Sequence, residues 1–226
     1  MNNKETLQSH NTRLSNNNTD LTSVLNKVNS LPARPTIEDK ILENNLSGEY
    51  ANNRIKKLGD YRFRNNTYIT KFSSTSITSI GVSAFDGCKS LKECNTPNVT
   101  SIGGSTFSDS GLIKAHFPNV KNVAFGSIFS NCASLEYVDF GSVLGFSSGS
   151  FSNCKLLTAI VIRNTSVCTL KYSTSFNGTP IEEGTGYIYV WKSLLEEYRS
   201  ATNWSAYNPE QFRAIEDYPE ICGEVE

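Results

Sequence analysis

The chain has 226 residues, of which 38% are hydrophobic and 19% charged, and its formal net charge is −1. A charge so close to zero argues against binding to nucleic acid or to an anionic membrane surface. The sequence contains no apolar run long enough to cross a bilayer, so we do not expect membrane insertion. The opening, MNNKETLQSHNTRLSNNN, lacks the apolar segment of a secretory signal, so we expect synthesis in the cytoplasm without export by the general route.

Residues 1–31 repeat every seven positions. One core position of the heptad is apolar, while the other is polar until Leu25. This pattern predicts a coiled-coil helix that joins identical chains, in which asparagine at a core position sets the register. The predicted seam consists of Leu7, Asn11, Leu14, Asn18, Leu21, Leu25 and Val28. A lone amphipathic helix packed on its own chain is the alternative.

The heptads alone do not decide between two and three chains, and we favour a homotrimer over a dimer. LPARP ends the predicted helix at Leu31–Pro35, because proline cannot continue a helix. Residues 32–50 are predicted to be a linker.

Residues 51–180 repeat about every 22 positions. The segments AFDGC, TFSDS, IFSNC and SFSNC are successive copies of one motif. Three columns of residues keep this spacing: Phe63, Phe85, Phe107, Phe129 and Phe151; Asn66, Cys88, Ser110, Cys132 and Cys154; and Ile69, Leu91, Ile113, Leu135 and Leu157. A fixed period of this length predicts a solenoid, in which each turn buries its apolar side against its neighbours.

Cysteine and serine share the second column, which predicts a small, weakly polar side chain that faces the core. A bridge between Cys132 and Cys154 is sterically conceivable on adjacent turns. Because Ser110 occupies the same column, we expect buried free thiols instead. The sequence has no C-x-x-C pair, so no zinc or redox site is predicted.

Each turn is expected to contain a strand of the form L-x-x-L-x-L, in which the residues flanking the second apolar position face outward. For one turn the segment LIKAHF from Leu112 fits best, although it shifts the column by one residue. The outward residues form a candidate binding face: Lys71, Ser73, Glu93, Asn95, Lys114, His116, Tyr137, Asp139, Ala159 and Val161. An ordinary solvated sheet is an equally weighted alternative.

Residues 181–226 are predicted to close the array with a strand and a helix. Trp191, Trp204, Tyr207 and Phe212 would cover the last open turn. The sequence contains His10 and His116 but none of the common catalytic motifs, so we predict no enzyme activity, no metal and no cofactor.

The motif ITSIGVSAFDGCKSLKECNTPNVTSIG resembles the BspA-like leucine-rich repeats of bacteria and some protists. The resemblance implies a right-handed leucine-rich-repeat solenoid, mostly β with short helical turns, closed by a C-terminal strand–helix cap. The segment LQSHNTRLSNNNTDLTSVLNKVNSLP resembles the start of some prophage-encoded proteins found near tail genes, which would imply a virion part.

Three functions remain open. A phage-type tail fibre or receptor-binding protein would recognise a host surface protein or glycan. A bacterial surface adhesin is the second possibility, although the expected lack of a signal peptide argues against it. An intracellular scaffold with a peptide partner is the third.

Overall fold

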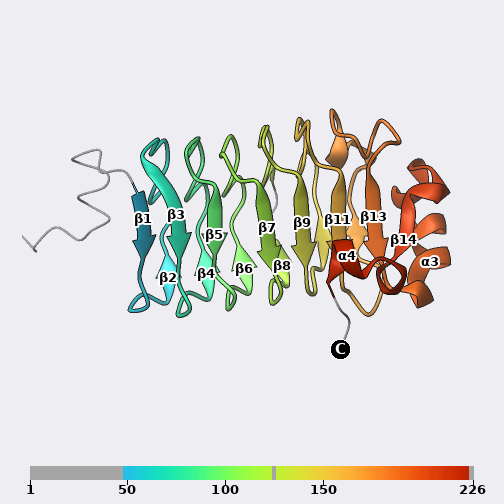
Figure 1. Ribbon diagram of the computed structural model, residues 1–226, viewed down its shortest axis with the longest axis horizontal. Helices are drawn as coiled ribbons and strands as arrows, with labels where there is room; N and C mark the ends of the chain where they lie inside the picture. Colours follow the sequence, from blue (N-terminus) through green and yellow to red (C-terminus); the bar gives the residue numbers. More distant parts are fainter. Residues whose placement is uncertain (1–47, 124–125, 224–226) are drawn as a thin grey trace, which may run out of the picture. The chain divides into compact units, whose positions relative to one another are not determined.

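The structure, a computed structural model, describes residues 48–123 and 126–223. Within these ranges the chain coils repeatedly, and most turns contribute a longer strand to one parallel sheet and a two-residue strand to another (Figure 1). The predicted coiled-coil residues 1–31 lie outside the described residues, so the oligomerisation seam stays a prediction. Of the predicted linker, residues 48–50 belong to the first strand.

The longer strands form what we call the long sheet. Its strands pair in parallel in two sections, β1-β3-β5 and β7-β9-β11-β13-β14. The strands are β1 (Gly48–Ala51), β3 (Ile69–Ser73), β5 (Glu93–Asn95), β7 (Lys114–Phe117), β9 (Tyr137–Phe140), β11 (Ala159–Ile162), β13 (Tyr187–Val190) and β14 (Phe212–Ala214).

The two-residue strands form a short sheet, also in two sections, β2-β4-β6-β8 and β10-β12. These strands are β2 (Lys57–Leu58), β4 (Ser79–Ile80), β6 (Ser101–Ile102), β8 (Asn122–Val123), β10 (Gly145–Phe146) and β12 (Thr169–Leu170). The helical segments follow the last of them: 3₁₀ turns η1 (Ser173–Phe176), η2 (Lys192–Leu194), η3 (Trp204–Ala206), η4 (Pro209–Gln211) and η5 (Ile215–Asp217), and helices α3 (Leu195–Ser200) and α4 (Pro219–Cys222).

The phenylalanine column is a continuous stack of buried rings. Phe85 and Phe107 lie nearly parallel with 5.5 Å between their centroids, and Phe107 and Phe129 with 5.4 Å. Phe176 continues the stack at 4.9 Å from Phe151, although the last turn is longer than the 22-residue period. Offset stacking of this kind adds to the stabilisation that comes from burial, so each turn holds the next in register.

The residue two positions after each phenylalanine makes a left-handed turn. It is Asn65, Gly87, Asp109, Asn131 or Asn153, with φ between 54° and 73°. Glycine, asparagine and aspartate tolerate this conformation better than other residues. The alternation of G, D and N in AFDGC, TFSDS and IFSNC therefore follows from the backbone.

The cysteines of the second column are buried free thiols in the structure. The thiols of Cys88, Cys132 and Cys154 each donate to the carbonyl of the phenylalanine one turn earlier, at 2.8–2.9 Å. Burial raises the pKa of Cys88 to about 12, so the group stays protonated near neutral pH. Ser110 fits because its hydroxyl lies 3.4 Å from the sulfur of Cys132 and can share a hydrogen bond with it.

The third column departs from strict 22-residue spacing at one turn. Ile113 is 37% exposed, and Leu112 takes the buried place beside the core, so the expectation that Ile113 belongs to this column is wrong. The segment LIKAHF does start at Leu112 as expected, since Ala115 and Phe117 are buried. Phe107 is therefore one residue closer to its strand than the corresponding Phe85, and the long sheet divides between β5 and β7 at this turn.

The C-terminal end of the array is covered by aromatic residues. Trp204 is fully buried, lies 6.1 Å from Phe176, and donates its indole N–H to the carbonyl of Cys168 at 2.8 Å. Tyr207 meets the same phenylalanine edge to face. Phe212 is buried in β14, while Trp191 is half-buried. These residues exclude water from a turn that has no further repeat to cover it.

We predict that Phe107→Ala lowers the free energy of unfolding by ~3–5 kcal/mol, because it leaves a cavity in the middle of the stack. Urea unfolding followed by circular dichroism measures the loss. Tyr172→Ala is the control, since Tyr172 is 47% exposed. Similar small losses for both variants would contradict the ring stack as a source of stability.

Candidate functional site

The outward-facing side chains of the long sheet form parallel rows. In one row Glu49 pairs with Lys71, which pairs with Glu93. In the next row Ser73 lies beside Asn95. Neighbouring parallel strands lie ~4.8 Å apart, so each row presents its groups at a regular spacing on a rigid backbone.

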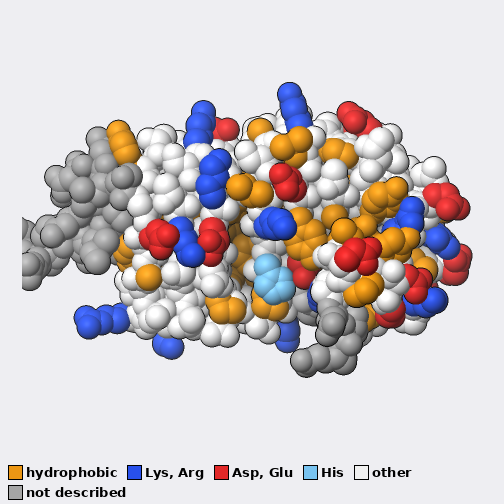
Figure 2. Space-filling model, in the orientation of Figure 1, with side chains coloured by type: hydrophobic (Ala, Val, Ile, Leu, Met, Phe, Trp, Pro, Cys, Tyr) orange, Lys and Arg blue, Asp and Glu red, His pale blue; other side chains and the backbone are white. Residues whose placement is uncertain are grey.

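Over β3, β5 and β7 this face is open. Lys71 and Ser73 are partly exposed, and Glu93, Asn95, Lys114 and His116 are exposed. Lys71 and Glu93 form an ion pair at 3.0 Å, and the hydrogen bond to Glu93, together with its charge, raises the pKa of the lysine. Figure 2 shows charged side chains over the N-terminal strands of this face and more apolar surface toward the C-terminal strands. We call the six exposed or partly exposed residues named here the open face.

Over β9 and β11 the face is covered. Tyr137 is partly buried, whereas Asp139, Ala159 and Val161 are 3%, 8% and 0% exposed. The expectation that these last three residues face solvent is therefore wrong. The side chains of Ala159 and Val161 do belong to a cluster separate from the main core, as outward-pointing residues should.

Residues 215–223, which we call the strap, provide the cover. The strap contains η5 and α4, and α4 lies in front of the long sheet (Figure 1). Its residues Ile215 and Cys222 form an apolar cluster with Ala159, Val161 and Tyr189. A short C-terminal segment thus buries the half of the face that the repeat pattern alone would leave exposed.

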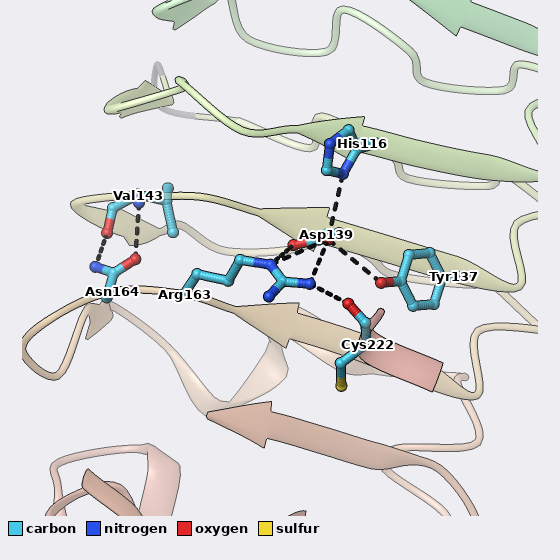
Figure 3. A network of polar contacts seen from close by, with 7 residues as sticks. All are labelled: His116, Tyr137, Asp139, Val143, Arg163, Asn164 and Cys222. Carbon is cyan, nitrogen blue, oxygen red and sulfur yellow. Dashed lines mark hydrogen bonds and ion pairs between the residues drawn. The ribbon is translucent and has the colours of Figure 1, made fainter. Parts of the chain in front are cut away.

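Asp139 is the centre of a polar network beneath the strap (Figure 3). The guanidinium of Arg163 donates to its carboxylate at 3.1–3.3 Å. The ring of His116 lies 3.2 Å from the same carboxylate, and the Tyr137 hydroxyl donates at 3.4 Å. Arg163 also donates to the main-chain carbonyl of Cys222, which joins the network to the strap.

The network determines the charge state of Asp139. Burial alone would raise the pKa of this carboxyl, but the hydrogen bonds from His116 and Arg163 outweigh burial and lower the pKa below its usual value of 3.8. Asp139 is therefore ionised at neutral pH. Its charge is balanced by Arg163, whose side chain is 22% exposed.

A second group of contacts lies where the strap leaves the sheet. The guanidinium of Arg213 stacks over the ring of Tyr187, 4.4 Å from its centroid, and also faces the ring of Tyr218 at 5.3 Å. Tyr218 in turn meets Tyr189 edge to face at 5.6 Å. These aromatic and cationic side chains hold the strap to β13 and β14.

Four residues of this site were not predicted from the sequence: Arg163, Arg213, Tyr218 and Cys222. Arg163 comes directly after the last strand residue, Ile162, and so lies outside the L-x-x-L-x-L pattern from which the outward residues were predicted. The strap sequence IEDYPEICG has no counterpart in the repeats. Alternation within YIYV could have indicated that Tyr187 and Tyr189 face outward.

Within the described ranges, no group of three His, Cys, Asp or Glu side chains is placed to hold a metal ion. In the same part of the chain, no helix is long and apolar enough to span a membrane. The carboxylate of Asp139 is engaged by Arg163 and His116 in a structural network.

Comparison with known families identifies the repeats. The family model for the BspA type leucine rich repeat region matches residues 56–182 in six copies, which is more than half of the chain. The chain belongs to the BspA-type leucine-rich repeat family. The parallel strands of the structure and the 22-residue period of the sequence agree with that membership. Comparison with curated proteins found no match.

Two solved structures show the same fold. The pneumococcal vaccine antigen PcpA matches with a TM-score of 0.53 at 18% identity, over 75% of this chain and 40% of that protein. A leucine-rich repeat protein from Bacteroides ovatus matches with a TM-score of 0.52 at 21% identity, over 63% of this chain and 39% of that protein. This chain thus spans about four-tenths of the length of either protein.

We predict that Arg163→Gln destabilises the protein by about 3 kcal/mol, at the lower end of the ~3–5 kcal/mol expected when a buried charge loses its partner, because Arg163 is partly exposed. Urea unfolding at pH 7 measures the loss. As the control, Lys71→Gln breaks an exposed ion pair and should cost less than ~1 kcal/mol.

The stabilisation by the Arg163–Asp139 pair should depend on pH. Because the pKa of Asp139 is lowered, this stabilisation is present well above pH 3.8 and is lost as the pH falls below that value. The difference between the wild type and Arg163→Gln should therefore shrink in acid, and a difference independent of pH would contradict this role.

Proposed function

We propose that this chain is a non-catalytic binding module that uses the open face to recognise a protein or glycan on a host surface. The observation that supports the proposal is the open face itself. It places Lys114, His116, Glu93 and Asn95 outward from rigid strands of one sheet. Such a face offers donors and acceptors without the cost of ordering flexible loops.

The chemistry of the open face favours a polar ligand of mixed character. Ammonium, carboxylate, amide and imidazole groups lie on neighbouring strands, and the carboxylate of Glu93 is paired with Lys71. A purely basic patch would favour polyanions, but this face carries both signs. It suits a protein surface with complementary charges or the hydroxyl groups of a glycan, rather than nucleic acid or lipid.

We expect that Lys114→Glu combined with His116→Ala lowers affinity for the ligand at least tenfold, since the exposed groups that β7 contributes to the open face are reversed or removed. Binding of the full chain to host cell-envelope fractions, followed by identification of the retained component and titration against it, measures the effect. Lys155→Glu combined with Lys121→Glu is the control, because both lysines are exposed and neither belongs to the open face. Equal binding by both double variants would place the ligand elsewhere.

The biological setting that we propose is a phage or prophage tail fibre or receptor-binding protein. The support is the resemblance of the N-terminal segment to tail-associated proteins, together with its heptads. A bacterial surface adhesin and an intracellular scaffold are the alternatives. Antibody detection in purified particles, on intact cells and in the cytosol separates the three settings.

Several heads on one stalk would make a weak binding face effective. When geometry lets more than one head engage, avidity can exceed the affinity of one head by ~10²–10⁴. The predicted heptad seam is suited to this purpose, because asparagines at its core positions would need partner chains to satisfy their amides.

We predict that the full chain forms a trimer through residues 1–31. Light scattering should give three times the chain mass of 25.0 kDa. A chain that lacks residues 1–31 should be a monomer that keeps the circular dichroism of the solenoid. A full chain that is monomeric at micromolar concentration would rule out the stalk and leave the proposed binding role to the single array.

A further inference from the structure

We infer that the strap occupies a second, covered part of the binding face, and that this part binds an apolar peptide segment when the strap leaves it. The inference rests on the proposed function, because the covered part continues the open face along the same sheet. It extends that function to a ligand of different chemistry.

The surface under the strap is apolar and aromatic. Ala159, Val161 and Tyr189 contact the strap, and Tyr137 and Tyr187 border them. These side chains point away from the solenoid core and lie outside the cluster that contains the phenylalanine stack. Exposed, they would form a contiguous apolar patch of the kind that marks interaction sites.

The strap shows what such a site accepts. Ile215 and Cys222 supply buried apolar groups, and the ring of Tyr218 packs against Tyr189. Arg163, held by the carboxylate of Asp139, binds the main-chain carbonyl of Cys222. A peptide in place of the strap therefore needs two or three apolar or aromatic side chains and a free backbone carbonyl near Arg163.

The strap is also attached in a way that allows it to open. Its main-chain to main-chain hydrogen bonds in the described part of the chain are local: Tyr218 donates to Ile215, Cys222 to Tyr218, and Gly223 to Pro219. Its contacts with the rest of the array are made by side chains, such as Glu216, which accepts from the main-chain N–H of Lys192. Segments held without ladder hydrogen bonds are the ones that open while the remainder stays folded.

A cleft already lies beside the far end of the strap. Its volume is about 360 Å³, and Lys114, Tyr137, Ala159, Ile221 and Cys222 are among the residues that line it. Lys114 belongs to the open face, so the cleft joins the open and covered parts. A ligand bound at the open face would therefore reach the edge of the strap.

The native thiols provide the test in the full chain. Cys222 lies in the strap, whereas Cys88, Cys132 and Cys154 lie in the solenoid core, and all of them are buried. Alkylation with iodoacetamide under native conditions, mapped by mass spectrometry, reports the opening of each region separately. If the strap opens locally, Cys222 should react at least tenfold faster than Cys132. Equal rates would show that the strap leaves only when the whole array unfolds, and would overturn the inference.

Two further comparisons test the surface itself. Tyr218→Ala should accelerate alkylation of Cys222 at least tenfold and leave Cys132 unchanged, whereas Tyr172→Ala should change neither. A synthetic peptide of residues 214–223 with Cys222→Ser, added to the full chain, should compete with the strap and accelerate alkylation of Cys222 with saturation. A scrambled peptide should not.

The inference fails if the peptide at millimolar concentration does not accelerate alkylation in either the wild type or the Tyr218→Ala variant. None of these measurements requires a host ligand. Their failure is therefore separate from failure of the proposed function, which the open-face variants test.

Discussion

The parallel stacking of turns is the constraint on which the rest of this molecule depends. Phenylalanine rings stack at 4.9–5.7 Å along the array, and the thiols of Cys88, Cys132 and Cys154 each donate to a carbonyl one turn earlier. No turn can bury its apolar side alone, so stability passes between neighbours. The same stacking fixes the outward rows at the spacing of the strands, and this makes the outward face rigid.

The array tolerates a one-residue irregularity because each turn packs only against its two neighbours, so its length need not match an ideal period. Leu112 replaces Ile113 in the core, and the long sheet divides there, yet Phe107 still stacks on both adjacent rings. The open face crosses this division. Its residues therefore come from two sections of sheet that the ring stack holds together.

The C-terminal segment gives the face two chemically different halves. The open half is polar and carries both charge signs, whereas the covered half is aromatic and is closed by side-chain contacts of the strap. Asp139 and Arg163 stand at the boundary, ionised and paired, and link His116 on the open side to Cys222 on the covered side. An otherwise uniform repeat thereby acquires one face whose two halves differ in chemistry.

The sequence by itself determined the repeat period, the buried columns and the direction in which each strand residue points. These properties are predictable from the sequence because every turn repeats the same contacts with its neighbours. The left-handed turns two residues after each phenylalanine, at Asn65, Gly87 and Asp109, are an example. Only the tertiary structure decided which outward residues stay exposed. The strap reaches Arg163 across 59 positions, through contacts that occur once and leave no periodic trace. Asp139 and Val161 were therefore assigned the correct direction but the wrong environment, since burial by a distant segment depends on the folded path of the chain.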